Sequence, residues 1–248
     1  MVYLIVGNWK MNGLPGTSES LVSEITDRAV DAVSLPDVVL CPPAPLLSAI
    51  SGVISEGPLQ LGAQDCHASK QGAHTGDVSA QLLKALGCQY VIVGHSERRA
   101  DHGESNLEIK AKANAALDSG LTPIVCVGET REERDAGRAA EVVDAQVTAS
   151  LPDNIMQEQI VIAYEPVWAI GTGLTATERD IGLAHTQIRE TFSRGYGLSN
   201  KLRVLYGGSV KGSNAVSILR ISEVNGALVG GASLNAEDFW NIIEACPQ

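Results

Sequence analysis

The sequence predicts one α/β domain, residues 1–248, folded as a closed (β/α)8 barrel with parallel strands. Short apolar runs rich in β-branched residues alternate along the chain with amphipathic segments, and polar or glycine-rich turns separate the two. Eight such units of about thirty residues each suit a barrel of this kind. No Pro/Ser-rich linker or low-complexity run divides the chain, so a single domain is preferred to two smaller ones.

The predicted strands are apolar runs of three to six residues, as expected for strands buried on both faces of a parallel sheet. In chain order they lie at Tyr3–Gly7, Val38–Cys41, Leu59–Ala63, Tyr90–Gly94, Thr122–Val127, Ile160–Tyr164, Arg203–Tyr206 and Ala227–Val229.

Helices are predicted between these strands, where apolar residues recur three and four positions apart. Thr130–Glu133 and Thr177–Asp180 have the pattern of capping boxes, the second with Asp in the place of Glu or Gln. Both mark helix starts shortly after strands. Gly87 and Gly120 stand where helices are expected to end.

A doubly wound open sheet is the alternative fold. That fold places a G-x-G-x-x-G phosphate fingerprint after its first strand. Here Gly7-Asn8-Trp9-Lys10 stands at that position instead. The barrel is therefore the preferred architecture.

The net charge excludes two classes of partner. Lys and Arg number 18 and Asp and Glu number 29, which gives a formal charge of −11. A chain this acidic is not expected to bind nucleic acid or an anionic membrane. A phosphate site would have to be built locally, from backbone N–H groups, helix N-termini and single lysines.

Cysteine usage and hydropathy indicate the compartment. The five cysteines are odd in number and form no C-x-x-C pair, so we expect reduced thiols in a cytoplasmic protein. The opening apolar run is too short for a signal peptide and lacks a basic segment, and no later stretch approaches ~18 uninterrupted apolar residues. The sequence thus predicts a protein that is neither exported nor membrane-spanning.

Chemistry in a barrel collects at the carboxyl ends of the strands. Polar, titratable and glycine residues stand at five of the predicted strand ends, namely Asn8 with Lys10, His95 with Glu97, Glu165, Gly207-Gly208-Ser209, and Gly230-Gly231. We therefore expect one mouth that combines acid–base groups with a phosphate-binding corner.

Glu165 is the most unusual of these residues. It follows the buried run Ile160–Tyr164, and Pro166 after it favours an extended backbone at Glu165. The small, glycine-rich segment Ala169–Gly173 then has the composition of a lid with hinges. Taken alone, this stretch would fit an ordinary βα turn with a solvated glutamate equally well.

Five motifs together resemble the triosephosphate isomerase family, whose fold is the TIM barrel. They follow one another in register over nearly the whole chain, at Asn8–Gly13, Val93–Arg99, Ala163–Gly173, Tyr206–Val210 and Leu228–Ser233. One such motif would be suggestive only, whereas five in order are highly specific.

The resemblance implies interconversion of dihydroxyacetone phosphate and D-glyceraldehyde 3-phosphate in glycolysis and gluconeogenesis, without a metal or organic cofactor. It implies that Glu165 moves a proton between two carbons through an enediol(ate) and that His95 polarises the carbonyl. Lys10 and Asn8 would bind substrate, and Glu97 would support them. The phosphate would be held by Gly171, Ser209, Gly230 and Gly231.

Physical arguments support two of these roles. His95 precedes a predicted helix start at Ser96, whose positive end favours a neutral imidazole. Lys10 supplies the local positive charge that a phosphate dianion needs in an acidic protein. The plainer interpretations are a structural histidine and a surface lysine.

The loop Gln64–Ser79 is longer and more polar than a tight βα loop requires. The resemblance implies that this loop, with Thr75 near its tip, reaches into a second subunit and braces Lys10 and His95 there. We therefore expect a homodimer; the plainer interpretation is a surface loop.

No metal site is predicted. The histidines outside the His95 motif, which are His67, His74, His102 and His185, show no H-E-x-x-H or comparable ligand spacing.

Two other functions stay open at this point. One is a phosphosugar aldolase that uses Lys10 as a Schiff base. The other is a non-catalytic barrel with a binding role.

The chain departs from the family pattern at a few positions. Leu174 stands where a lysine is frequent, at the end of the expected lid, and Asn235 stands where lysine is common. Ala227 occupies a position where phenylalanine is frequent, which affects local packing.

Overall fold

The computed structural model describes residues 2–55, 57–170 and 175–247, and in this part of the chain eight parallel strands close into one barrel. Each strand pairs with its neighbours in chain order, and β1 pairs with β8, Leu4 opposite Gly226, to close the ring. The strands are β1 Leu4–Asn8, β2 Asp37–Cys41, β3 Gln60–Ala63, β4 Cys88–Val93, β5 Thr122–Val127, β6 Val161–Tyr164, β7 Arg203–Tyr206 and β8 Gly226–Val229. The predicted (β/α)8 barrel is confirmed.

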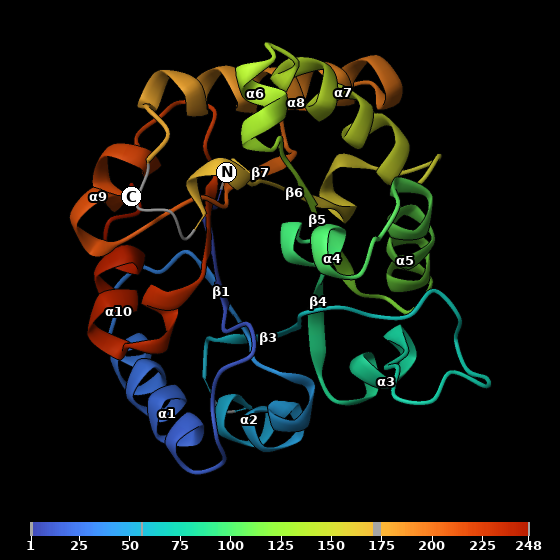
Figure 1. Ribbon diagram of the computed structural model, residues 1–248. Helices are drawn as coiled ribbons and strands as arrows, with labels where there is room; N and C mark the ends of the chain where they lie inside the picture. Colours follow the sequence, from blue (N-terminus) through green and yellow to red (C-terminus); the bar gives the residue numbers. More distant parts are fainter. Residues whose placement is uncertain (1, 56, 171–174, 248) are drawn as a thin grey trace.

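The helices form a ring around the barrel, which Figure 1 shows in a view along the barrel axis. They are α1 Thr17–Val30, α2 Leu47–Ile54, α3 Ala80–Ala85, α4 Ser96–Asp101, α5 Asn106–Asp118, α6 Arg131–Asp135, α7 Ala139–Ser150, α8 Glu178–Tyr196, α9 Gly212–Leu219 and α10 Ala236–Glu244. Short 3-10 turns are η1 Ala44–Leu46, η2 Gln157–Gln159, η3 Val167–Ala169 and η4 Gly231–Leu234. Among the described residues, no helix has the length and hydrophobicity needed to cross a membrane.

All eight predicted strands are present, and those at Thr122–Val127 and Arg203–Tyr206 have the predicted bounds. The largest error is at β4, which begins two residues earlier than predicted, at Cys88, and ends before Gly94. Gly94 has φ +68°, a left-handed conformation that cannot continue a strand and that favours glycine.

Both predicted capping boxes are confirmed. The Thr130 hydroxyl accepts from the backbone N–H of Glu133, whose side chain in turn accepts from the N–H of Thr130. Thr177 and Asp180 make the same reciprocal pair at the start of α8. The predicted helix ends also hold, because Gly87 and Gly120 adopt left-handed conformations just beyond α3 and α5.

The core has two layers. Alternate strand residues such as Leu4, Val6 and Ile92 point into the barrel and form one apolar cluster there. The residues between them, such as Ile5 and Val91, belong to a larger cluster between the strands and the helices. This packing makes the barrel a rigid support for the loops at its carboxyl end.

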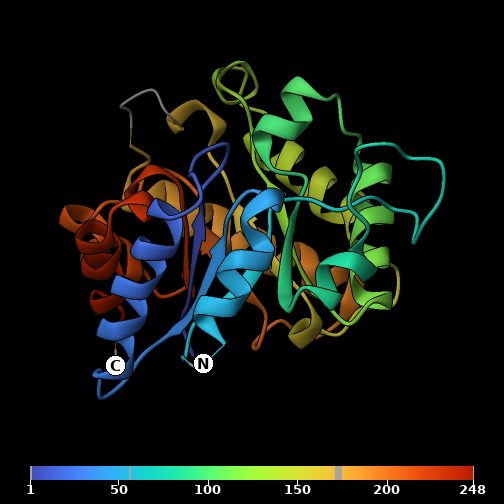
Figure 2. The same ribbon diagram turned by 90° about the horizontal axis from the view of Figure 1, so that it is seen from below.

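The loop that joins β3 to α3 projects from the body of the barrel. It is drawn in teal in Figures 1 and 2 and extends beyond the neighbouring helices in both views. It corresponds to the predicted long loop Gln64–Ser79. Residues 70–77, which form the projecting part, are all exposed.

Candidate active site

A cavity of about 1180 Å³ lies at the carboxyl ends of the strands. Eight of the nine predicted site residues line it, which are Asn8, Lys10, His95, Glu97, Glu165, Ser209, Gly230 and Gly231. The ninth, Gly171, lies outside the described residues, as does Leu174. The structure therefore brings all eight described residues together around one cavity.

Glu165 emerges from the end of β6 and is buried, with an exposed fraction of 2%. Its Oε1 lies 2.9 Å from Nε2 of His95, and its Oε2 accepts from the backbone N–H of Ser96 at 2.8 Å. Burial works to raise the pKa of Glu165, but the charge of His95 and the Ser96 hydrogen bond hold it below the ordinary value. Both partners thus favour the ionised form of the carboxylate.

His95 is the N-cap of α4. Its Nδ1 accepts from the backbone N–H of Glu97 at 3.2 Å, which leaves Nε2 as the ring nitrogen that faces Glu165. Burial works to lower the pKa of His95, but the adjacent Glu165 carboxylate raises it above the ordinary value. The helix start alone favours a lower pKa, and the Glu165 carboxylate in contact with the ring acts in the opposite direction.

Lys10 is held in an unusual backbone conformation with φ +53°, the one left-handed non-glycine residue in the described chain. The Asn8 side chain accepts from the Lys10 backbone N–H at 3.1 Å, and Gln64 donates to the Lys10 carbonyl at 2.8 Å. The ammonium then lies 2.5 Å from Oε1 of Glu97. A strained residue fixed on both sides in this way is typical of a functional position.

Glycine residues form a second wall of the cavity, beside Ser209. A Cβ at Gly208 would lie 2.2 Å from the Tyr206 hydroxyl, so this position needs glycine. Gly231 begins the turn η4, and the start of α9 at Gly212 borders the same space. Backbone N–H groups at such glycine turns and helix starts can bind a phosphate. Lys211 and Ser213, which no sequence motif singled out, line this wall too.

The triosephosphate isomerase family model matches residues 3–246 of the chain. The chain belongs to the triosephosphate isomerase family. The triosephosphate isomerase of Granulibacter bethesdensis is 53% identical to this chain, and the alignment covers 99% of both chains. The triosephosphate isomerase of Afipia carboxidovorans is 51% identical, and the alignment covers 98% of this chain and 97% of the relative. The crystal structure of triosephosphate isomerase from Bartonella henselae superposes with a TM-score of 0.91 at 42% identity, covering 99% of each chain.

Glu129 is a functional candidate that the sequence analysis missed. It is fully buried and accepts from the Tyr164 hydroxyl and, at 2.8 Å, from Nε1 of Trp168. Arg134 also contacts it at 3.2 Å and stacks 4.5 Å from the Trp168 ring centre. A glutamate just after the apolar run of β5 was a signal available in the sequence. Glu129 thus holds Trp168, the residue directly before the expected lid.

Three of the four histidines outside His95 lie in distinctive surroundings. His185 is buried, which lowers its pKa to about 3, so it stays neutral. The spacing of His67 and His74 predicts no metal site, yet the loop brings them to Asp77 with possible ligand atoms within 4.8 Å of one another. Sequence spacing missed this group because a folded loop, and not a helix or strand period, creates it.

Proposed function

We propose that Glu165 and His95 carry out the isomerisation that defines the triosephosphate isomerase family, between dihydroxyacetone phosphate and D-glyceraldehyde 3-phosphate in glycolysis and gluconeogenesis. The observation that carries the proposal is the 2.9 Å contact between these two side chains inside a cavity that has a glycine-rich wall. Substrate and product are isomers, so protons move and no outside reductant is consumed. Acid–base groups suffice for that reaction.

Glu165 is the base in this proposal. It takes a proton from the carbon beside the substrate carbonyl and returns it to the neighbouring carbon through an enediol(ate). In the cavity without substrate its two oxygens are engaged by His95 and Ser96. The carboxylate must leave these partners to reach a substrate carbon. Its buried position makes it a stronger base once those contacts are released.

His95 polarises the carbonyl as a neutral imidazole. The raised pKa of His95 depends on the Glu165 carboxylate beside it. When Glu165 turns to the substrate, burial and the N–H of Glu97 on Nδ1 both oppose a second ring proton. Nε2 then donates a neutral hydrogen bond to the oxygen where negative charge develops. Triosephosphate isomerase is itself the standard example of a neutral histidine in this role, so the assignment follows the family.

Lys10 and Asn8 bind the substrate oxygens and phosphate in this account, and Glu97 positions the ammonium of Lys10 at 2.5 Å. The glycine wall would hold the phosphate through backbone N–H groups, with Gly171, Ser209, Gly230 and Gly231 as the binding residues. Cationic and backbone donors at fixed positions stabilise charge as it develops and need no rearrangement during the reaction.

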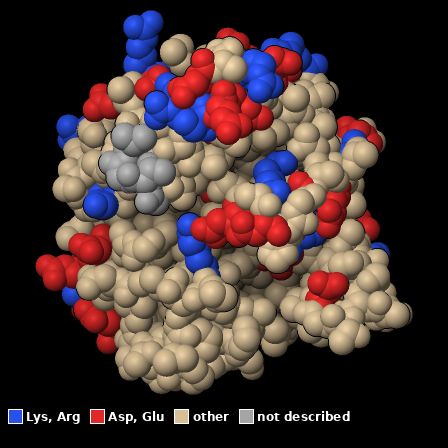
Figure 3. Space-filling view, in the orientation of Figure 1, with Lys and Arg blue, Asp and Glu red and all other residues tan. Residues whose placement is uncertain are grey.

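A homodimer belongs to the proposal, with loop 64–79 as its contact and Thr75 near the tip. The area over α2 and the neighbouring end of α1 carries few charged side chains on the face in Figure 3. Met11 and Leu14, on the loop after β1, are 96% and 70% exposed. Large apolar side chains exposed together suit a surface that a partner covers.

We also propose a cytoplasmic location, in keeping with five buried cysteines that are all free.

The test is a coupled assay of glyceraldehyde 3-phosphate isomerisation after exhaustive chelation. We expect rapid turnover that chelation leaves unchanged. The aldolase alternative requires a deprotonated lysine, whereas the Lys10 ammonium is paired with Glu97. Borohydride with a carbonyl substrate would trap a Schiff base at Lys10 in an aldolase. Trapping there, or no isomerisation at all, would refute the proposal.

A further inference from the structure

We propose that Arg99, on α4, is a positioning residue that fixes His95 and Glu165 at the separation that their reaction needs. The inference rests on the proposed isomerisation and adds a residue to it. Arg99 is not among the residues that line the cavity, so it acts on the substrate only through the residues that it positions.

The guanidinium of Arg99 is held at its far end by two polar side chains. Nη1 donates to Oδ1 of Asn106 at 2.6 Å, and Nη2 donates to the Ser150 hydroxyl at 3.3 Å. Ser150 is fully buried and in turn donates to Oδ1 of Asn106 at 3.1 Å. Asn106 begins α5 and Ser150 ends α7. This closed ring of hydrogen bonds fixes the plane of the guanidinium.

The same guanidinium holds two backbone carbonyls at the strand ends. Its Nε donates to the Gly94 carbonyl at 2.9 Å, and Nη2 also donates to the Cys126 carbonyl at 3.0 Å. The last residues paired between β4 and β5 are Val93 and Val125, so the buried Cys126 carbonyl lies beyond the ladder that joins the two strands. A buried carbonyl needs a donor, and Arg99 supplies it.

These carbonyls stand next to the acid–base pair in the chain. Gly94 directly precedes His95, and its φ of +68° makes the turn that places His95 at the start of α4. On β5 the following carbonyl, that of Val127, accepts from the N–H of Glu165 at 2.8 Å. Arg99 therefore links the backbone that carries His95 to the backbone that supports Glu165.

The contacts of Arg99 also leave its charge free to act on Glu165. Its acceptors are two carbonyls, an amide oxygen and a hydroxyl, none of which is ionised. Burial lowers the pKa of Arg99, and the Glu165 carboxylate is among the groups that oppose this shift. A guanidinium stays protonated in proteins, so its charge favours the ionised form of Glu165.

The geometry requires arginine in particular. A planar group with donors in fixed directions can hold acceptors on several sides at once. A lysine has the same charge but ends in one ammonium group, which cannot reach the acceptors on both sides together. Arg99→Lys therefore keeps the charge and removes the geometry.

A matched control separates positioning from support of the fold. Arg189, on α8, also donates to backbone carbonyls, those of Ser199 and Leu202, at 2.8 and 2.9 Å. Leu202 directly precedes β7, so this group lies at the amino end of the strands, opposite to the cavity, and Arg189 is not among the residues that line the cavity. Arg189→Lys should thus disturb packing without disturbing the acid–base pair.

The test measures kcat and KM in the coupled assay for the wild type, Arg99→Lys, Arg189→Lys and Asn106→Ala. Asn106→Ala removes one acceptor and keeps Arg99, so it is the milder variant. NMR titration of the His95 ring in the same proteins reports its contact with Glu165, because that carboxylate raises the pKa of His95. Thermal unfolding and light scattering check the fold and the assembly of each variant.

Arg99→Lys should lower kcat at least roughly tenfold and change KM by less than about threefold, because a small displacement of acid–base groups lowers the rate while the glycine wall is untouched. The pKa of His95 should fall, since burial acts with less opposition when the carboxylate moves away. Asn106→Ala should show smaller changes in the same direction. Arg189→Lys should lose stability but keep the kcat and the His95 titration of the wild type.

An unchanged His95 titration in Arg99→Lys, or in Asn106→Ala should Arg99→Lys not fold, would overturn the inference. A loss of kcat in Arg189→Lys as large as that in Arg99→Lys would also overturn it. The titration needs no turnover. An inactive wild type would therefore refute the proposed isomerisation, while the titration would still decide the role of Arg99.

Discussion

The carboxylate of Glu165 lies 2.9 Å from Nε2 of His95, although the two residues come from strands that are not neighbours in the barrel. Both are buried, and each shifts the pKa of the other. The carboxylate raises the pKa of His95, and the imidazole helps to hold the pKa of Glu165 down. Protonation of His95 should therefore depend on Glu165.

Glu165→Gln should lower the pKa of His95, because burial then acts without the carboxylate that opposes it. NMR titration of the His95 ring in both proteins measures this directly. In the wild type the raised pKa contributes stability that is present below the unfolded value, near 6.5, and lost as pH rises through the folded value. The free energy of unfolding of the wild type, relative to that of Glu165→Gln, should thus increase as pH falls from about 8 to about 6. An unchanged His95 titration in the variant would contradict this coupling.

Lys10→Met should reduce kcat/KM by at least roughly 100-fold, because it removes a charged donor from the cavity. Lys201→Met is the matched control, since Lys201 is exposed and pairs with Glu158 outside the cavity. Steady-state kinetics at several salt concentrations compare the two. If kcat/KM of Lys10→Met lay within about threefold of the wild-type value, the proposed role of Lys10 in substrate binding would be contradicted.

The site was largely predictable because each strand end carries its own local signal. Glu165 stood out as a carboxylate after a buried run, and the position of His95 before a helix start was readable from Ser96 and Glu97. The contact between Glu165 and His95 could not be predicted from the sequence, because the ends of β4 and β6 come together only in the closed barrel. The effect of the Glu165 carboxylate on the pKa of His95 could not be predicted for the same reason.

Features created by loops escaped prediction. The grouping of His67, His74 and Asp77 depends on a loop that folds back, and no periodicity reports such a shape. In the sequence Asn235 is only a departure from the family pattern, yet its side chain accepts from the Asp238 N–H and caps α10. Short-range capping of this kind is detectable in a sequence once the helix start is placed correctly.

Gly182→Ala should stabilise the protein by about 0.5–1 kcal/mol, because Gly182 lies inside α8 and alanine has the higher helix propensity. An added Cβ there would meet Ile221 at 3.6 Å, an ordinary contact. Gly226→Ala is the contrasting variant, since its Cβ would lie 1.8 Å from the Leu4 carbonyl oxygen. Urea denaturation measures both. A loss of stability in Gly182→Ala would show that the helix is packed more tightly there than the contact indicates.

Thr75→Arg should weaken the proposed homodimer and lower activity at low protein concentration, because it places a charge at the tip of the contact loop. Val33→Arg adds the same charge at a fully exposed site after α1 and serves as the control. Light scattering should give a mass near twice that of one chain for the wild type. A monomeric mass with undiminished turnover would refute the dimer.

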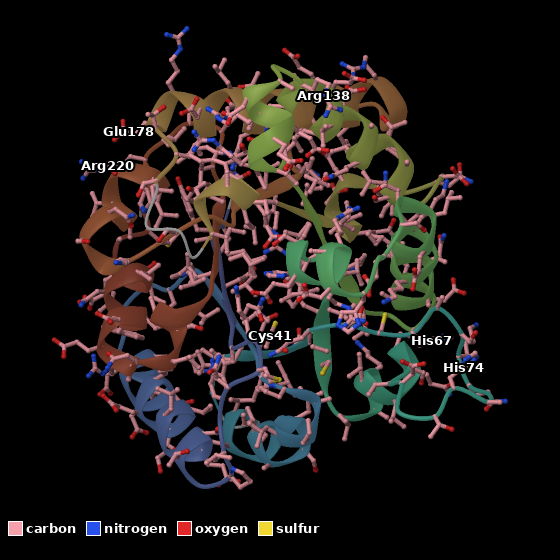
Figure 4. All side chains as sticks on the ribbon, viewed as in Figure 1. Cys41, His67, His74, Arg138, Glu178 and Arg220 are labelled. Carbon is pink, nitrogen blue, oxygen red and sulfur yellow. The ribbon has the colours of Figure 1, made fainter. Side chains whose placement is uncertain are left out.

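The most direct test of the central claim is kcat for Glu165→Gln in the coupled assay. If Glu165 is the base, kcat should fall by roughly 10²–10⁴-fold or more, while Glu178→Gln keeps wild-type turnover. Glu178 is exposed at the start of α8 and lies at the outer edge of the molecule in Figure 4. A Glu165→Gln enzyme with turnover close to that of Glu178→Gln would contradict the assignment of Glu165 as the base.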